Sequence, residues 1–144
     1  MKNEKVQYLL DTNIFIWLAS QPENLSPQVV KLVQEASDEK RLFVSQISLW
    51  EIALKESLGK LKLSLPIGIW LKRATENIET LSLNLDIIID STNLPGDFHK
   101  DPADRFIVAT ARHHLLTLIS SDKLIIDYAK NGFVKAQPVS ILQN

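Results

Sequence analysis

The sequence predicts a three-layer α/β/α fold with a mainly parallel central sheet. Short apolar runs alternate with segments of helical periodicity along the chain, which is the pattern of α/β proteins. The chain has 144 residues, four glycines and six prolines, and it contains neither an internal repeat nor a flexible linker. We therefore expect a single domain over residues 1–144.

Five short apolar runs predict the strands of this sheet, because each is bounded by turn or capping residues. In chain order they cover residues 6–10, 41–45, 80–83, 116–119 and 134–139. The last run contains Pro138, which cannot donate a hydrogen bond to a neighbouring strand. We expect this run at the edge of the sheet.

Capping residues and apolar periodicity predict the helices between the strands. Ser26 followed by Pro27 is typical of a helix start, and Gly59 is typical of a helix end. Two of the expected helices cover residues 14–19 and 47–58. Between them lies a helix that starts after Pro27 and has Val29, Val33 and Ala36 on one stripe.

Four more helices are expected later in the chain. The first is marked by Leu71, Ala74 and Ile78, and the second has Leu85, Ile88 and Ile89 on one face. The third begins at Asp101 and Pro102, with Ile107 and Ala111 facing inward, and the last begins at residues 120–122.

Acidic side chains fall at the ends of the predicted strands. Asp11 directly follows the first strand, and Asp122 follows the fourth in the same way. Because the carboxyl ends of parallel strands meet at one edge of a sheet, where ligands bind, we expect these carboxylates to meet. Asp104 lies in the first turn of the helix that Asp101 opens, and Glu51 is a charge within an otherwise apolar stretch.

Each acid also has a purely structural interpretation, which the sequence leaves open. Asp11, Asp101 and Asp122 fit helix N-caps, and Asp104 suits the helix dipole. Glu51 is spaced to pair with Lys55. Taken together, however, clustered carboxylates repel one another unless a hard cation neutralises them. Mg²⁺ and Mn²⁺ prefer such oxygen ligands.

Composition and charge exclude several classes of protein. Sixteen Lys and Arg against seventeen Asp and Glu give a formal net charge of −1, which excludes a strongly basic nucleic-acid tail. The absence of cysteine excludes disulfides, cysteine-ligated zinc and a thiol nucleophile. The first residues lack the apolar stretch of a signal peptide, and no run approaches the ~18 apolar residues of a membrane span. We expect a soluble cytoplasmic protein without a membrane partner.

The histidines and glycines do not form a known catalytic or nucleotide-binding motif. His99 stands alone in a turn, and the adjacent His113 and His114 point away from each other on a helix. Their spacing matches no zinc motif. The sequence also lacks a P-loop, a GxGxxG fingerprint and a GxSxG elbow.

Four ordered blocks of the sequence resemble those of PIN-domain proteins. Residues 9–13 (LLDTN) resemble the opening motif of this family, and residues 45–61 look like the second motif of the VapC toxins. Residues 99–105 (HKDPADR) are similar to the HxDPxDR block, and Ser121 with Asp122 fits the fourth acid. The resemblance spans about residues 6–139, with a longer loop than usual at residues 96–98.

The resemblance implies a Mg²⁺- or Mn²⁺-dependent ribonuclease with a PIN-like fold. It implies the toxin of a type II toxin–antitoxin pair, usually homodimeric, with RNA as substrate and a VapB-like antitoxin as partner. The implied catalytic and metal-binding acids are Asp11, Glu51, Asp104 and Asp122. Candidate supporting or RNA-contacting residues are Thr12, Asn13, Ser45, Ser48, Asp101 and Arg105. For Arg105, contact with the RNA backbone and pairing with a nearby acid are equally expected.

Two other functions remain open at this point. A haloacid-dehalogenase-like phosphohydrolase also begins with a strand-end Asp, but its motif needs a second Asp where this chain has Asn13. A non-catalytic binding module would use the acids as caps and hold a partner helix in an apolar groove. For the toxin, we expect an antitoxin segment to cover such a groove, with Ile14, Trp17 and Leu18 among the apolar residues. We expect Trp50 and Trp70 to pack in the core or to line that groove.

Overall fold

A five-stranded parallel sheet forms the centre of the protein, whose computed structural model describes residues 5–99 and 101–140. The strands follow the order β3-β2-β1-β4-β5. Their bounds are β1 (Tyr8–Leu10), β2 (Leu42–Ser45), β3 (Glu79–Leu81), β4 (Thr117–Ser120) and β5 (Lys135–Pro138). The predicted fold class is confirmed, and the sheet in this part of the chain is entirely parallel.

The strand order reverses direction between β1 and β4. Leu9 in β1 pairs with Phe43 of β2 on one side and with Leu118 of β4 on the other. From β1 the chain adds β2 and β3 in one direction, whereas β4 and β5 extend the sheet in the opposite direction. Ligands bind at this kind of switch point in open α/β sheets.

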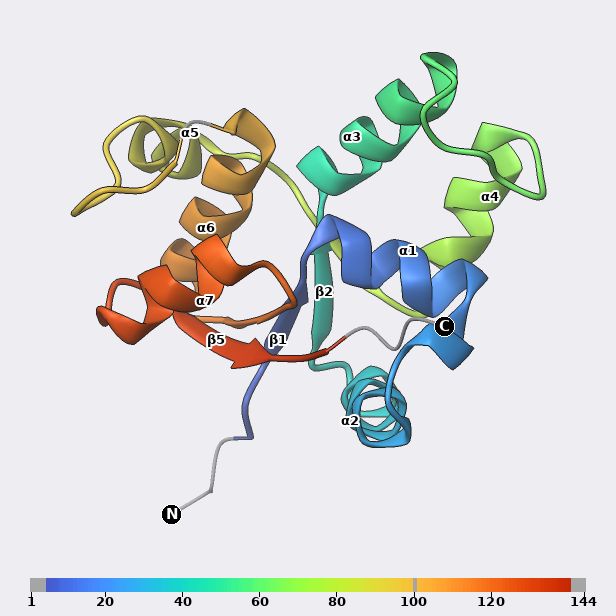
Figure 1. The fold of residues 1–144 in the computed structure, drawn as a ribbon, viewed down its shortest axis with the longest axis horizontal. Helices are drawn as coiled ribbons and strands as arrows, with labels where there is room; N and C mark the ends of the chain where they lie inside the picture. The colour runs from blue at the N-terminus through green and yellow to red at the C-terminus, as the bar shows by residue number, and fades with distance from the viewer. Residues whose placement is uncertain (1–4, 100, 141–144) are drawn as a thin grey trace.

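Helices cover both faces of the sheet (Figure 1). One layer contains α1 (Thr12–Ser20), the short 3₁₀ helix η1 (Pro22–Asn24), α2 (Pro27–Asp38) and α4 (Ile67–Ala74). The other contains α5 (Leu85–Ser91), α6 (Pro102–His114) and α7 (Lys123–Lys130). Helix α3 (Gln46–Ser57) follows β2 directly and contributes Ile47 to one core and Ile52 to the other. Within residues 5–99 and 101–140, no helix is long and apolar enough to cross a membrane.

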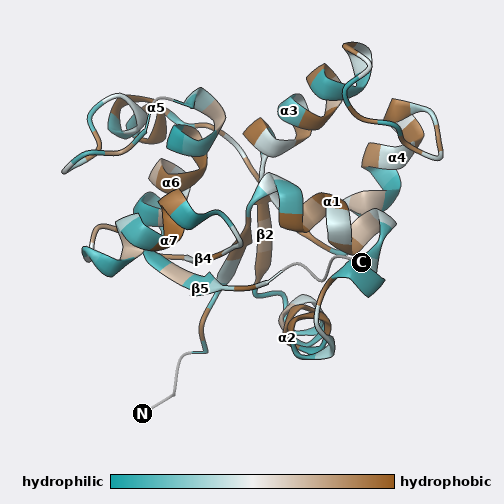
Figure 2. Ribbon diagram, viewed as in Figure 1, coloured by the Kyte–Doolittle hydropathy of each residue, from teal (hydrophilic) through white to brown (hydrophobic). Residues whose placement is uncertain are grey.

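Two apolar cores hold the layers to the sheet, because side chains alternate along each strand. In β1, Leu9 packs toward α5–α7 and Leu10 packs toward α1, α2 and α4. In β4, Leu118 and Ile119 divide in the same way. Figure 2 shows the hydrophobic colour along β2, while the surrounding helices carry both colours. Full burial of such a Leu or Ile side chain contributes roughly 1.5–3 kcal/mol.

Some predicted boundaries were wrong for local reasons. The helix marked by Leu71, Ala74 and Ile78 ends at Ala74, and Thr75 is its C-cap, with its hydroxyl donating to the Leu71 carbonyl at 2.7 Å. Ile78 therefore lies outside the helix, and the following strand is Glu79–Leu81 rather than 80–83. Helix α1 begins at Thr12, before the expected residue 14, because Asp11 caps it.

Helix α5 has its apolar face turned outward. Leu85, Ile88 and Ile89 share one face, as predicted, but they are exposed, and Ile87 on the opposite side enters the core. At the other edge of the sheet, Pro138 lies in β5, which pairs with β4 alone in the described sheet, so the predicted edge position is confirmed. Val134 and Val139 flank this strand rather than forming part of it.

Candidate metal centre

Asp11 occupies a buried position at the end of β1. Its Oδ1 accepts a hydrogen bond from the Ile14 backbone N–H at 2.9 Å, which caps α1. Its Oδ2 accepts a short hydrogen bond from the Ser120 hydroxyl at the end of β4. Ser120 also accepts a bond from the Asp122 backbone N–H at 3.0 Å. The Ser120 hydroxyl thus links the ends of β1 and β4.

Asp104 and Asp122 meet across the same edge. Asp122 caps α7 through the Leu124 N–H at 2.9 Å, and Asp101 caps α6 through the Asp104 N–H at 3.2 Å. One ligand atom each of Asp104, Asp122 and His99 lie within 4.8 Å of one another. The structural interpretation of Asp11 and Asp122 is therefore confirmed, because both carboxylates cap helices, and the same two residues lie at the adjacent ends of β1 and β4.

The carboxylates at this edge disfavour one another's ionised form. Burial raises the pKa of Asp11 from 3.8 to about 6, and the negative charges of Asp122 and Glu51 add to the rise, against hydrogen bonds from Ser120 and Ile14. Burial likewise raises the pKa of Asp104 from 3.8 to about 7, and the Asp101, Asp122, Glu51 and Asp11 carboxylates raise it further. The cluster therefore holds negative charge at a free-energy cost in the metal-free protein.

Glu51 joins this cluster from α3. Its carboxylate lies 3.4 Å from the Lys55 ammonium, so the predicted i,i+4 pair exists. Its side chain is only 15% exposed, whereas that of Lys55 is 40% exposed. Glu51 also contributes to the raised pKa values of Asp11 and Asp104, which places it within electrostatic reach of both.

Of the predicted supporting residues, Thr12 and Ser45 make hydrogen bonds within or between the helices around the site, whereas Asn13 lies on the surface. The Thr12 hydroxyl donates to Ser48 Oγ at 2.9 Å, and this buried bond joins α1 to α3. Ser45 is fully buried and caps α3 through the Ile47 N–H at 3.1 Å. Asn13 is exposed and lines a shallow pocket with residues 61–64.

Arg105 contacts backbone carbonyls rather than an acid. Its Nε donates to the Ser91 carbonyl at 2.8 Å, and its Nη1 donates to the carbonyls of Phe98 and His99 at 3.1 and 3.2 Å. The predicted pairing with a nearby acid was therefore wrong in the described part of the chain. A charged guanidinium satisfies several carbonyls at once, and these bonds hold the loop before α6 against the helix.

Two residues of the site were not predicted to be part of it. Ser120 was expected only at the start of the last helix, although a hydroxyl at the end of a strand, two residues before an acid, is a usable signal. His99 lies in the HKDPADR block, but its isolation in the sequence argued against a role. Its Nε2 is 3.2 Å from Asp104 Oδ2. The fold brings the two side chains together across the start of α6.

The donor set fits a hard divalent cation. The converging atoms are mainly carboxylate oxygens, which Mg²⁺ and Mn²⁺ prefer. Among residues 5–99 and 101–140, no Lys or Arg forms an ion pair with Asp11, Asp104 or Asp122. A bound cation would neutralise the charges that raise the pKa values of Asp11 and Asp104. The carboxylates that could hold it are Asp104 and Asp122, which lie in one cluster with His99, and Asp11 and Glu51, whose charges act on Asp104.

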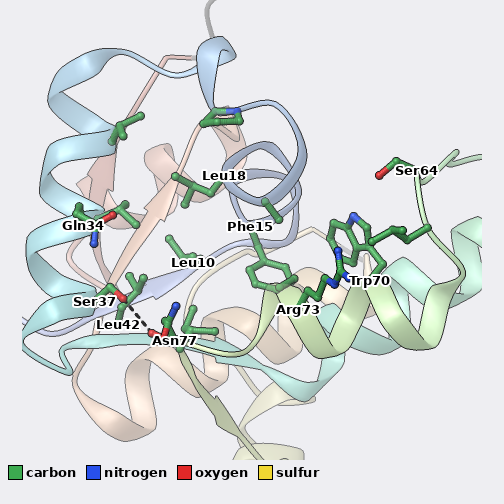
Figure 3. A pocket seen from close by; sticks show the side chains of 17 residues that line it. Leu10, Phe15, Leu18, Gln34, Ser37, Leu42, Ser64, Trp70, Arg73 and Asn77 are labelled. Atoms are coloured by element: carbon green, nitrogen blue, oxygen red, sulfur yellow. Dashed lines mark hydrogen bonds between the residues drawn. The ribbon is translucent and has the colours of Figure 1, made fainter.

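A second feature, away from the acids, is a pocket of about 640 Å³ between α1, α2 and α4, which apolar and polar side chains line together. Phe15 and Leu18 line it from α1, and Trp70 and Arg73 line it from α4 (Figure 3). The Phe15 and Trp70 rings meet edge to face, with centroids 6.0 Å apart. Of the apolar residues predicted for a groove, Leu18 lines this pocket, Trp17 lines the shallow pocket beside Asn13, and Ile14 is fully buried. Trp70 is buried as expected, whereas Trp50 is 55% exposed.

Comparison with known proteins fixes the family. The PIN domain family matches residues 8–131, a stretch that contains all four acids and their strand ends. The chain belongs to this family. Ribonuclease VapC22 of Mycobacterium tuberculosis is 30% identical to this PIN domain over 115 residues, which cover 80% of this chain and 86% of that relative. The predicted relation to PIN domains and VapC ribonucleases is confirmed.

Solved structures show the same fold as this PIN domain. VapBC2 from Rickettsia felis, bound to a DNA fragment from their promoter, gives a TM-score of 0.71 at 15% identity, over 94% of this chain and 100% of that chain. A toxin–antitoxin complex from Klebsiella pneumoniae gives a TM-score of 0.58 at 24% identity, over 83% of this chain and 90% of that chain. At these identities the likeness concerns the fold.

Proposed function

We propose that this PIN domain is a Mg²⁺- or Mn²⁺-dependent endoribonuclease that acts as the toxin of a type II toxin–antitoxin pair. The observation that carries the proposal is the convergence of Asp11, Asp104 and Asp122 at the switch point of the sheet. Buried acids with raised pKa values in a crevice are typical of functional sites. The 30% identity to a ribonuclease supports the same conclusion.

The chain's own residues would hold the catalytic geometry. Asp11, Glu51, Asp104 and Asp122 supply the oxygen ligands, and Ser120 fixes Asp11 against the end of β4. The Thr12–Ser48 bond fixes α1 against α3, and with them Asp11 relative to Glu51. A divalent cation at this site would acidify a water and neutralise charge on the scissile phosphate. Arg105 holds the loop that precedes Asp104 through its backbone contacts.

Cleavage assays on structured RNA test the activity. We expect cleavage with Mn²⁺ or Mg²⁺, none with EDTA, and products with a 5′-phosphate and a 3′-hydroxyl. Asp11→Asn should be inactive, and His114→Gln, at the far end of α6, should be a fully active control. Activity in EDTA, or a 2′,3′-cyclic phosphate product, would contradict the proposed mechanism. A binding module without catalytic function would show no saturable stabilisation by Mn²⁺.

We further propose that a VapB-like antitoxin silences the enzyme by occupying the pocket between α1, α2 and α4. Two observations support this: the similar folds include toxin–antitoxin complexes, and the pocket exposes apolar side chains beside Arg73. An antitoxin segment that continues from this pocket to the carboxyl end of the sheet would bring a basic side chain to the acids. Expression alone should arrest growth, and co-expression with the adjacent small reading frame should restore it. Leu18→Glu should weaken this rescue without reducing RNA cleavage.

We also propose that the protein forms a homodimer, that it is cytoplasmic, and that residues 1–144 form a single PIN-like domain. The dimer is supported by apolar side chains that α3 and α5 leave exposed: Trp50, Leu54, Leu58, Leu85, Ile88 and Ile89. Light scattering on the purified protein should give twice the 16.3 kDa chain mass. A monomer at micromolar concentration would contradict the dimer and leave the nuclease proposal unaffected.

A further inference from the structure

The imidazole of His99 is held firmly beside the acidic cluster. Arg105 donates to the carbonyls of Phe98 and His99, which fixes the backbone of this loop against α6. The Phe98 ring lies against the His99 ring with centroids 4.3 Å apart, and against Tyr128 at 4.8 Å. The His99 side chain is 23% exposed. Its orientation is therefore set by packing and by backbone hydrogen bonds.

The contacts of the two ring nitrogens assign the tautomer. The Asp101 backbone N–H donates to Nδ1 at 3.4 Å, so Nδ1 is an acceptor. A neutral imidazole with an accepting Nδ1 carries its proton on Nε2. Nε2 is buried and makes no hydrogen bond within the described residues, although Asp104 Oδ2 lies only 3.2 Å away. A buried N–H needs an acceptor, and the Asp104 carboxylate is the one within range.

We propose that His99 is a positioning residue, whose Nε2–H donates to Asp104 Oδ2 and orients that carboxylate for a divalent cation. The inference rests on the proposed function, since it assumes that Asp104 is a metal ligand. The assigned tautomer argues against His99 as a ligand itself, because the Nε2 lone pair is taken by the proton. Carboxylates that bind metals are commonly fixed by such outer hydrogen bonds, and losing one typically costs 10–100-fold in metal affinity.

Mn²⁺ binding by three variants tests this role without an activity assay. His99→Leu removes the donor, His99→Gln keeps an N–H at nearly the same place, and His114→Leu is a control at the other end of α6. The dissociation constants are measured by electron paramagnetic resonance of free Mn²⁺. We expect His99→Leu to bind roughly 10–100-fold more weakly than the wild type, by analogy with other outer-sphere partners. His99→Gln and His114→Leu should bind nearly as tightly as the wild type.

Three results would overturn the inference. Wild-type affinity in His99→Leu would show that the donor has no role, and an equal loss in His99→Gln would show that the donor N–H is not what matters. Pulsed electron paramagnetic resonance of the Mn²⁺-loaded wild type should show no ¹⁴N coupling from a directly bound imidazole. If such a coupling is present and disappears in His99→Gln, His99 is itself a metal ligand and the inference is wrong. A wild type that binds no Mn²⁺ would remove the proposed function as well, whereas the other results leave it intact.

Discussion

The acidic residues at the two ends of the parallel sheet have opposite electrostatic surroundings. At the amino ends of β1 and β2, Glu39 lies 2.6 Å from the Lys5 ammonium and 2.8 Å from the Arg41 guanidinium. Hydrogen bonds from these two cations lower the pKa of Glu39 below its usual 4.5. At the carboxyl ends, burial first and neighbouring carboxylates second raise the pKa values of Asp11 and Asp104 to about 6 and about 7.

The comparison distinguishes acidic residues that form ordinary ion pairs from acidic residues that belong to the proposed site. The Glu39 end follows the ordinary rule that opposite charges pair on a surface. The Asp11 end departs from that rule at three positions that lie apart in the sequence, because Asp11, Asp104 and Asp122 pair with no Lys or Arg among the described residues. Local departures of this kind, in a fold that is otherwise consistent, mark functional sites. The contrast between the two ends therefore supports the proposed cation site at the acidic end.

The largest expected effect comes from Asp104→Asn. A neutral amide is a poor ligand for a hard cation, so RNA cleavage should be abolished and most of the stabilisation by Mn²⁺ lost. In the metal-free protein the same change should leave stability equal or higher, because it relieves repulsion from Asp101, Asp122 and Glu51. Thermal melts with EDTA and with Mn²⁺ measure both effects. A variant that still cuts RNA would show that the third acid is assigned to the wrong residue.

The next effect is on the pH dependence of the metal-free protein. Since Asp11 and Asp104 titrate at about 6 and about 7 when folded and near 3.8 when unfolded, the folded state binds more protons between these values. Stability should fall as pH rises from 4 to 7, by about 3 kcal/mol for Asp11 alone. Urea unfolding in EDTA measures this fall against the double variant Asp11→Asn/Asp104→Asn. A wild type that gains stability over this range relative to the double variant would contradict the account.

A smaller effect separates two neighbouring aspartates. Asn caps a helix about as well as Asp, so Asp101→Asn should change the free energy of unfolding by only about a few tenths of a kcal/mol. Loss of a charge near Asp104 should slow RNA cleavage modestly. Comparing this variant with Asp104→Asn, three residues away in the sequence, makes the test selective. Complete inactivity of Asp101→Asn would reverse the two assignments.

The smallest effect is expected at the opposite end of the sheet. Glu39→Gln breaks exposed ion pairs with Lys5 and Arg41, so it should change the melting temperature little, and not at all in 1 M salt. The sign of its pH dependence is opposite to that of Asp11. Stability from Glu39 is present above its unfolded pKa and is lost as pH falls through the lowered folded value. Mn²⁺ affinity should match the wild type, and a weaker affinity would break the contrast.

The sequence predicted the layers of the fold because the apolar runs and capping residues are local signals. It also predicted that Asp11 and Asp122 would meet, since both follow parallel strands whose ends share an edge. The hydrogen bond from Ser120 to Asp11 depends on which strand lies beside β1, and the sequence does not state strand order. Ser120 was therefore missed as part of the site.

Loop geometry explains the other errors. The contact of His99 with Asp104 and the three carbonyl bonds of Arg105 depend on the path of the loop before α6, which carries no periodic signal. Ile78 continued a helical spacing, but the helix ends at Ala74, and the spacing of apolar residues carries no signal for that end. The outward face of α5 has helical periodicity, but its residues are exposed. Periodicity alone does not show whether an apolar helix face packs in the core of the chain or stays on its surface.

Calorimetric titration of Mn²⁺ into the metal-free wild type at pH 6.5 tests the central claim most directly. The carboxylates must lose their protons to bind a cation, so binding should be saturable and should release protons. Repeating the titration in buffers of different ionisation enthalpy measures that release, which the raised pKa values of Asp11 and Asp104 make detectable at this pH. Saturable binding with proton release, absent in Asp104→Asn, is the predicted result. No saturable binding, or equal binding in Asp104→Asn, would contradict a metal centre at the carboxyl end of the sheet.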